Sequence, residues 1–386
     1  MRLWYLSVES IIMCTVAKSD KNILLGGFLQ MKKIIALVLA LVLAFGLVAC
    51  NNGGDQSSTA SGSSTASTDG SSTASTGGDA SGDLITVGFS QVGAESAWRT
   101  ANTKSIQEAL TEENGFELIF SDGQQKQEIQ ITALRSFIEQ GVDYIAFSPT
   151  VESGWDDVLN EIKEADIPLI LIDRTTDNPD ESLYVTWMGS DFQTEGVRAG
   201  EWLVAYLEEQ GLMDSEVVIA ELQGTVGAAA ANGRMAGFKS VVEKYDNLNV
   251  KYSQTGDFTT AKGQEVMEAF LKSDTANEIK VLFSHNDDMA IGAITAIEAA
   301  GRKPGEDICI ISCDGGKAMF QNIVDGKANC VVECNPLLGE GLAETIKKLE
   351  AGEEVEKKTF SDEDVFDQNG LNGALKAADH INERQY

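Results

Sequence analysis

The stretch YIAFSPTVESGWDDVLNEIKEADIPLILI, residues 144–172, decides the fold class. Its two ends, Tyr144 to Phe147 and Leu169 to Ile172, are short apolar runs that predict buried strands. Between them, apolar residues recur at helical spacing from Trp155 to Ile162, with Ser153 as the expected N-cap. A strand, a helix and a strand in this order predict an α/β protein with a parallel sheet.

The same alternation continues on both sides of this stretch. Helical spacing also precedes it, with Gly141 as the expected helix stop. Two series of strands, spread over about 300 residues, predict two similar doubly wound lobes. The other predicted strands are Leu84 to Phe89, Phe116 to Phe120, Val217 to Leu222, Val250 to Ser253, Val281 to Ser284, Ile308 to Ser312 and Cys330 to Glu333.

The N-terminal part has the pattern of an export signal. Met31-Lys32-Lys33 and the apolar run that follows fit a signal peptide over 31–49, which makes residues 1–30 a misread upstream extension. The run is too short for a comfortable membrane span. Leu47 to Cys50 resembles the bacterial lipobox, which predicts a lipidated Cys50; an unmodified thiol after a conventional signal is the alternative. The Ser/Thr/Gly-rich residues 50–82 predict a flexible tether.

Composition excludes several function classes. The chain has 386 residues with 29 Lys and Arg against 60 Asp and Glu, a net charge of -31, which argues against nucleic acid as a partner. Two histidines leave little room for histidine-based catalysis or metal binding.

Four cysteines form two CxxxC pairs that could suggest zinc: Cys309, Cys313, Cys330 and Cys334. Each pair falls in a predicted strand, where residues four apart are about 13 Å from each other. Zinc–thiolate bonds of about 2.3 Å cannot span that distance. We therefore expect no metal and buried reduced thiols, with a cross-strand disulfide as the alternative.

Polar residues directly follow many of the predicted strands. Because ligands of open parallel sheets bind at the carboxyl ends of strands, these residues are candidate ligand contacts. Their Asp, Asn and Arg groups can hold vicinal hydroxyls bidentately, and Trp98 can stack on an apolar sugar face. The segments are Gln91 to Arg99, Asp122 to Gln125, Asp173-Arg174, Asn286 to Asp288 and Asp314-Gly315, with Arg234 on a following helix.

Several motifs resemble the ribose/galactose-type periplasmic sugar-binding proteins of ABC transporters, in the same order along the chain. The motifs are Val87 to Gly93, Leu171 to Arg174, Glu221 to Gly227, Ser284 to Ala293 and Ser312 to Gly315. Glu95 to Arg99 and Asp122 to Gln127 resemble the galactofuranose-binding proteins within this family. The resemblance covers roughly residues 84–350.

The resemblance implies a non-catalytic receptor without a cofactor. The implied ligand contacts are Trp98, Arg99, Asp173, Arg174, Arg234, Phe258, Asn286 and Asp314, with Glu95, Ser96 and Gln124 as further contacts. Ribose-binding relatives carry Phe where this chain has Cys313, and a sugar-binding Gln where it has Cys334. These departures leave the identity of the sugar open.

The family also implies the domain organisation. We expect an N-terminal lobe of residues 84–190 plus 335–362 and a C-terminal lobe of 191–334 plus 363–386, joined by a three-strand hinge. The lobes would close on a monosaccharide and present it to a membrane permease. The expected protein is a monomer, held by its lipid on the outer face of the cell membrane or in the periplasm.

Three alternatives share parts of this pattern. An exported glycan-processing enzyme could use two of the carboxylates as acid and base. A sugar sensor for a membrane signalling receptor would need the same closed form. A sugar-responsive repressor core has this fold, but the signal segment and the lack of a basic helix-turn-helix argue against it.

Overall fold

The computed structural model describes residues 84–386. Within this part of the chain no helix is long and apolar enough to cross a membrane. The predicted upstream extension (1–30), signal peptide (31–49) and tether (50–82, including Cys50) lie outside the described residues.

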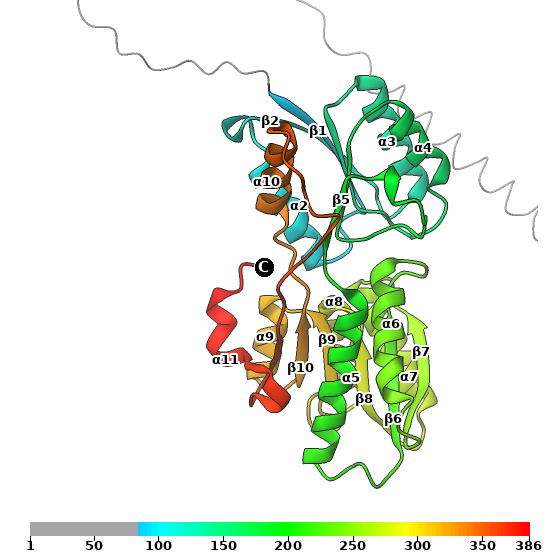
Figure 1. The fold of residues 1–386 in the computed structure, drawn as a ribbon. Coiled ribbons are helices and arrows are strands. Elements are labelled where there is room, and N and C mark those ends of the chain that lie inside the picture. Colours follow the sequence, from blue (N-terminus) through cyan, green and yellow to red (C-terminus); the bar gives the residue numbers. More distant parts are fainter. Residues whose placement is uncertain (1–83) are drawn as a thin grey trace, which may run out of the picture. The chain divides into compact units, whose positions relative to one another are not determined.

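The first lobe is a parallel six-stranded sheet with helices on both faces (Figure 1). The strand order is β11-β5-β4-β3-β1-β2. Helices α2 (Ala97–Ala109) and α10 (Gly339–Glu350) pack on one face, and α3 (Gln127–Gln140) and α4 (Asp156–Glu164) on the other. Because both faces are covered, strands such as YIAF and LILI are apolar throughout rather than alternating. The strands are β1 (Ile85–Gln91), β2 (Phe116–Asp122), β3 (Tyr144–Phe147), β4 (Leu169–Ile172), β5 (Thr186–Gly189) and β11 (Lys358–Phe360).

The second lobe repeats this plan with seven strands in the order β13-β12-β10-β9-β8-β6-β7, where only the β10–β12 pair is antiparallel. Helices α5 (Phe192–Glu209) and α6 (Ala229–Val242) cover one face. The other face is covered by α7 (Thr260–Ser273), α8 (Asp287–Ala299) and α9 (Lys317–Val324), with the short α11 (Ala377–His380) beside α9. The strands are β6 (Val217–Gln223), β7 (Leu248–Thr255), β8 (Ile279–Ser284), β9 (Cys309–Asp314), β10 (Cys330–Glu333), β12 (Val365–Asp367) and β13 (Leu375–Lys376). The two doubly wound lobes of the predicted fold class are confirmed.

Three segments connect the sheets. The chain leaves the first sheet after β5 and enters α5 of the second lobe. It returns between β10 and α10, and passes once more to the second lobe between β11 and β12. In Figure 1 these segments run side by side between the lobes, which is the arrangement of a hinge.

Local predictions had mixed outcomes. Gly141 ends α3 in the left-handed conformation, as expected. The predicted N-cap Ser153 is wrong, because α4 begins at Asp156 and its cap position is the buried Trp155, which makes no capping hydrogen bond through its side chain. At α8 the N-cap is Asn286, whose side chain accepts the N–H of Met289.

The four cysteines are buried free thiols, in agreement with the preferred prediction. Cys309 and Cys313 both lie on β9, and Cys330 starts the neighbouring β10. Burial raises the pKa of each of these thiols, so that they remain protonated and behave as small apolar side chains.

Candidate functional site

A small cavity lies between the lobes, at the carboxyl ends of strands from both sheets. Asp173 and Arg174 directly follow β4, Asn286 follows β8, and Asp314 ends β9. This edge is where open parallel sheets bind ligands. Residues of both lobes line the cavity: Glu95, Ser96, Trp98, Arg99, Asp173, Arg174, Phe192, Ala230, Arg234, Phe258, Asn286, Asp314 and Cys334.

Two guanidinium groups and two carboxylates form the first lobe's half of the site. The Nη1 atom of Arg99 lies 2.7 Å from Oδ2 of Asp173, and its Nε lies 3.1 Å from Oε1 of Glu95. Arg174 reaches the same Glu95 oxygen at 3.5 Å. All four side chains are at most 4% exposed, so each charge is compensated only by its neighbours.

The pKa values follow from this packing. Burial favours neutral Glu95, but Arg99 and Arg174 outweigh it and lower the pKa of Glu95. Burial and the nearby Arg99 lower the pKa of Arg174 to about 10, which still leaves it charged at neutral pH. Within the described chain, Oε2 of Glu95 and Nε of Arg174 are buried and make no hydrogen bond. Unpaired buried polar atoms are costly, so these two atoms point to a bound polar molecule.

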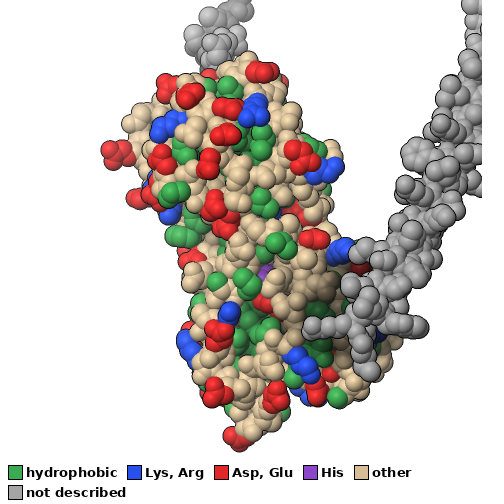
Figure 2. Space-filling model, turned by 90° about the vertical axis from the view of Figure 1, so that its right-hand side faces the viewer, with side chains coloured by type: hydrophobic (Ala, Val, Ile, Leu, Met, Phe, Trp, Pro, Cys, Tyr) green, Lys and Arg blue, Asp and Glu red, His purple; other side chains and the backbone are tan. Residues whose placement is uncertain are grey.

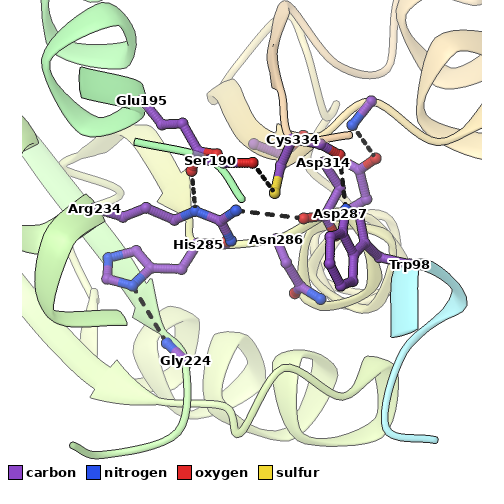
Figure 3. A network of polar contacts seen from close by, with 12 residues as sticks. Trp98, Ser190, Glu195, Gly224, Arg234, His285, Asn286, Asp287, Asp314 and Cys334 are labelled. Atoms are coloured by element: carbon purple, nitrogen blue, oxygen red, sulfur yellow. Dashed lines mark hydrogen bonds and ion pairs between the residues drawn. The ribbon is translucent and has the colours of Figure 1, made fainter. Parts of the chain in front are cut away.

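Arg234 on α6 organises the second lobe's half (Figure 3). Its Nε pairs with Oε2 of Glu195 at 2.6 Å, its Nη2 lies 3.6 Å from Oδ1 of Asp314, and its Nη1 donates to the backbone oxygen of His285. Burial would lower the pKa of Arg234, but the acidic groups around it, Glu195 first, raise it. Burial raises the pKa of Asp314. The neighbouring Arg234 acts in the opposite direction but only partly offsets this rise.

Aromatic rings complete the walls. The indole nitrogen of Trp98 donates to the backbone oxygen of Cys334 at 2.7 Å, which fixes the ring. Arg99 lies 4.7 Å from the Trp98 ring centre, and Arg174 lies 5.1 Å from that of Phe258. Phe258 packs so close to Gly224 that a Cβ there would lie 1.9 Å from the ring. The site therefore combines flat apolar surfaces with charged hydrogen-bonding groups, as carbohydrate recognition requires.

Residues 87–354 match the family model described as "Periplasmic binding protein domain". The chain belongs to this periplasmic binding protein family. Among the most similar relatives is the galactofuranose-binding protein YtfQ of Escherichia coli (strain K12), 43% identical over 73% of this chain and 87% of YtfQ. The fructose import binding protein FruE of Bifidobacterium longum is 33% identical over 89% of this chain and 97% of FruE.

Solved structures of family members agree with this assignment. A protein from Mycobacterium smegmatis in complex with β-D-fucofuranose is 49% identical, with a TM-score of 0.73 over 78% of this chain and 96% of the other. The binding protein of an arabinose ABC transporter from Shewanella sp. ANA-3, bound to α- and β-L-arabinofuranose, is 45% identical, with a TM-score of 0.71 over 78% of this chain and 95% of the other. The present chain is thus a periplasmic binding protein with the type I fold.

The structure brings together ten of the eleven residues predicted for the site. These are Glu95, Ser96, Trp98, Arg99, Asp173, Arg174, Arg234, Phe258, Asn286 and Asp314. Two of them also serve the backbone: Ser96 caps α2, and Asn286 caps α8 while its Nδ2 donates to the oxygen of Phe258.

Gln124 is the exception. Its side chain is exposed and does not line the cavity, because the backbone turns there with a positive φ of 51° and Asp122 accepts the Gln124 N–H. The structure therefore does not bring Gln124 to the cavity, and its role as a ligand contact stays a prediction. The sequence reasoning also missed Phe192 and Ala230, which the helices α5 and α6 contribute from positions without a recognisable motif.

A second polar cluster joins the three connecting segments. Ser190, Cys334 and Glu363 each belong to one segment, and Ser190 Oγ contacts both Cys334 Sγ and the Glu363 carboxylate. The N–H of Asn335 also donates to Glu363, at 2.9 Å. Donor atoms of Glu195, Cys334 and Glu363 lie within 4.8 Å of one another, a set that a metal ion could use. Arg234 engages Oε2 of Glu195, and Ser190 and Asn335 engage Glu363, whereas among the described residues Oε1 of Glu195 has no hydrogen-bond partner. The cluster links the three connecting segments as a hinge network.

Proposed function

We propose that this chain is the solute receptor of an ABC importer and binds a monosaccharide, in its furanose form, between the two lobes. The proposed contacts are the ten cavity residues that the sequence predicted, together with Phe192 and Cys334. The receptor then delivers the sugar to a membrane permease.

The observation that carries the proposal is a pair of buried atoms without a hydrogen bond on two residues that line the cavity, Oε2 of Glu95 and Nε of Arg174. One accepts and the other donates a hydrogen bond, which suits hydroxyl groups because a hydroxyl does both. Trp98 and Phe258 offer flat apolar faces beside them. A neutral, polyhydroxylated ring satisfies both requirements at once.

The furanose form is suggested by the relatives. The named proteins bind galactofuranose, β-D-fucofuranose and L-arabinofuranose, at 43–49% identity to this chain. A five-membered ring is also the smaller of the two ring forms, which suits a narrow cavity.

Binding should involve lobe movement. The cavity volume is only about 20 Å³, close to what one water molecule needs and far below that of a ligand pocket. We propose that residues 84–190 plus 335–362 move against 191–334 plus 363–386, with the sugar entering the open form and the lobes closing around it. Support comes from the three connecting segments, since each joins one sheet to the other.

A catalytic role and a nucleic-acid partner are less well supported than sugar binding. The carboxylates Glu95, Asp173 and Glu195 are each engaged by an arginine, and the relatives named above are binding proteins. On the face in Figure 2, acidic side chains spread over both lobes while Lys and Arg occur singly, which does not suit a phosphate backbone.

We further propose membrane anchoring through a lipid on Cys50, based on the lipobox-like Leu47 to Cys50. At least two acyl chains are needed for stable anchoring, which lipobox processing supplies. A Cys50→Ser variant should lose the lipid mass and leave the membrane fraction or remain unprocessed. Unchanged mass and unchanged membrane partition would contradict anchoring.

Calorimetry with ring-locked sugars tests the binding function. Methyl β-D-galactofuranoside should bind, whereas methyl β-D-galactopyranoside, which has the same atoms in a six-membered ring, should bind more weakly. D-Fucose, L-arabinose, D-ribose and D-fructose extend the panel. At a hundredfold excess over Kd, binding adds about 2.7 kcal/mol to the unfolding free energy. Binding of no sugar in this panel, or release of product from the glycosides, would overturn the proposal.

A further inference from the structure

A contact between the lobes lies outside the sugar cavity. The backbone N–H of Ala97, the first residue of α2, donates to Oδ2 of Asp288, the second residue of α8, at 2.9 Å. The other oxygen of Asp288 accepts from the hydroxyl of Thr260 at 3.0 Å. Neither Ala97 nor Asp288 lines the cavity, so the contact is separate from the ligand groups.

Ala97 needs this partner because of its place in the helix. The first N–H groups of a helix have no acceptor within the helix. The helix's own cap, Ser96, uses its hydroxyl oxygen for the N–H of Arg99. The N–H of Ala97 is therefore left over, and a carboxylate is well suited to it because the start of a helix carries partial positive charge.

The contact exists only when the lobes are together. Asp288 belongs to the second lobe and α2 to the first, so opening the cleft separates the exposed Ala97 from the half-buried Asp288 and leaves water as their partner. Trp98 and Arg99 directly follow Ala97 and enter the cavity. A bond at Ala97 consequently holds the two cavity side chains of α2 against the second lobe.

We propose that Asp288 caps helix α2 across the cleft in the closed form only, and thereby sets sugar affinity without touching the sugar. The cap raises the closed population in the absence of ligand. Because apparent Kd is the intrinsic Kd divided by the competent fraction, a larger closed population gives tighter apparent binding. This inference rests on the proposed function, that of a sugar receptor whose lobes close.

The two partners of the bond can be removed independently. Ala97→Pro deletes the N–H donor, and proline is tolerated at the first helical position, where no helical hydrogen bond is lost. Ser96 already has the extended backbone that a residue before proline prefers, with φ -143° and ψ 163°. Asp288→Ala deletes the acceptor, and Asp288→Asn keeps an acceptor oxygen but removes the charge.

Calorimetry with methyl β-D-galactofuranoside and L-arabinose on the full chain tests the cap. Ala97→Pro and Asp288→Ala should each weaken binding about threefold to tenfold, the range for one charge-assisted hydrogen bond at a partly exposed site. Asp288→Asn should weaken binding less than Asp288→Ala does. The double variant should be no weaker than the stronger single effect, because both changes remove the same bond. Asp157→Ala is the matched control, since Asp157 is the exposed second residue of α4, and it should leave Kd unchanged.

Several outcomes are decisive. Unchanged Kd in the natively folded single variants, or additive effects in the double variant, would overturn the cap. If the parent binds no probe sugar, the proposed function fails instead. The cap is then tested by the distance between fluorophores on the two lobes without ligand: the variants should be more open than the parent, and identical distances would overturn it.

Discussion

Asp173→Asn is the most informative single change in the cavity. Asp173 follows β4 in the left-handed conformation, with φ 62°, and Asn is one of the few residues that adopt it readily. The two side chains have the same shape, so the change removes charge without opening a cavity. In the unchanged protein, Oδ2 of Asp173 lies 2.7 Å from Nη1 of Arg99 and 3.3 Å from the hydroxyl oxygen of Ser148.

The expected magnitude follows from these contacts. Arg99 keeps Glu95 as a partner at 3.1 Å, so the free protein should stay folded and lose about 1–3 kcal/mol of unfolding free energy. A bound sugar loses a charged acceptor, which is worth about 1.5–3 kcal/mol. This corresponds to roughly tenfold to more than a hundredfold in Kd.

Calorimetry and urea denaturation of the same preparations separate binding from folding. Asp166→Asn is the matched control, because Asp166 is also left-handed, with φ 57°, but exposed and outside the cavity. The Asp166→Asn control should bind the sugar with the same Kd as the parent protein. The reasoning is refuted if Asp173→Asn, folded by circular dichroism, binds the sugar as tightly as the Asp166→Asn protein does.

Two further predictions concern stability. Gly237→Ala should lower the unfolding free energy by about 1–3 kcal/mol, because its Cβ would lie 2.1 Å from the backbone oxygen of Gln193 where α5 and α6 pack. Gly341→Ala, in an open helical position, should instead be neutral or stabilising in urea denaturation, and equal effects at both sites would contradict the packing argument. Burial raises the pKa of Glu363 from 4.5 to about 8, so its contribution to stability is complete below pH 4.5 and is lost as pH rises through 8. The melting temperature of Glu363→Gln should therefore fall less than that of the parent between pH 5 and 9, and parallel profiles would refute this role.

Sequence reasoning was most accurate for the central strands. The predicted boundaries of β3, β4 and β10 agree with the structure, because strands covered on both faces are short apolar runs with clear ends. It missed β5, β11, β12 and β13. The three exposed residues of β11, for example, carry no apolar pattern, and this strand pairs with β5 from about 170 positions away in the chain.

For the site, too, the sequence revealed residues with a clear local pattern and missed those without one. Residues that follow strands in recognisable motifs were found, because topology alone brings strand ends together. Glu195 was not found: it lies inside α5, and its partner Arg234 is 39 positions further along. Only the close packing of α5 on α6 shows that this carboxylate holds the arginine in place. Gln124 lies outside the cavity for a local reason, a turn in which its backbone has a positive φ and its side chain is exposed.

The pairing of every cavity arginine with carboxylates has a consequence for the charge of a ligand that the cavity can bind. Arg99, Arg174 and Arg234 face Glu95, Asp173, Glu195 and Asp314, so the cavity carries no excess positive charge. A uronic acid or a sugar phosphate would bring an anion into a buried space that offers it no counter-charge, at a desolvation cost of several kcal/mol. With the function proposed above, we therefore expect the receptor to select neutral sugars over charged ones, and any phosphorylation of the sugar would follow its transport.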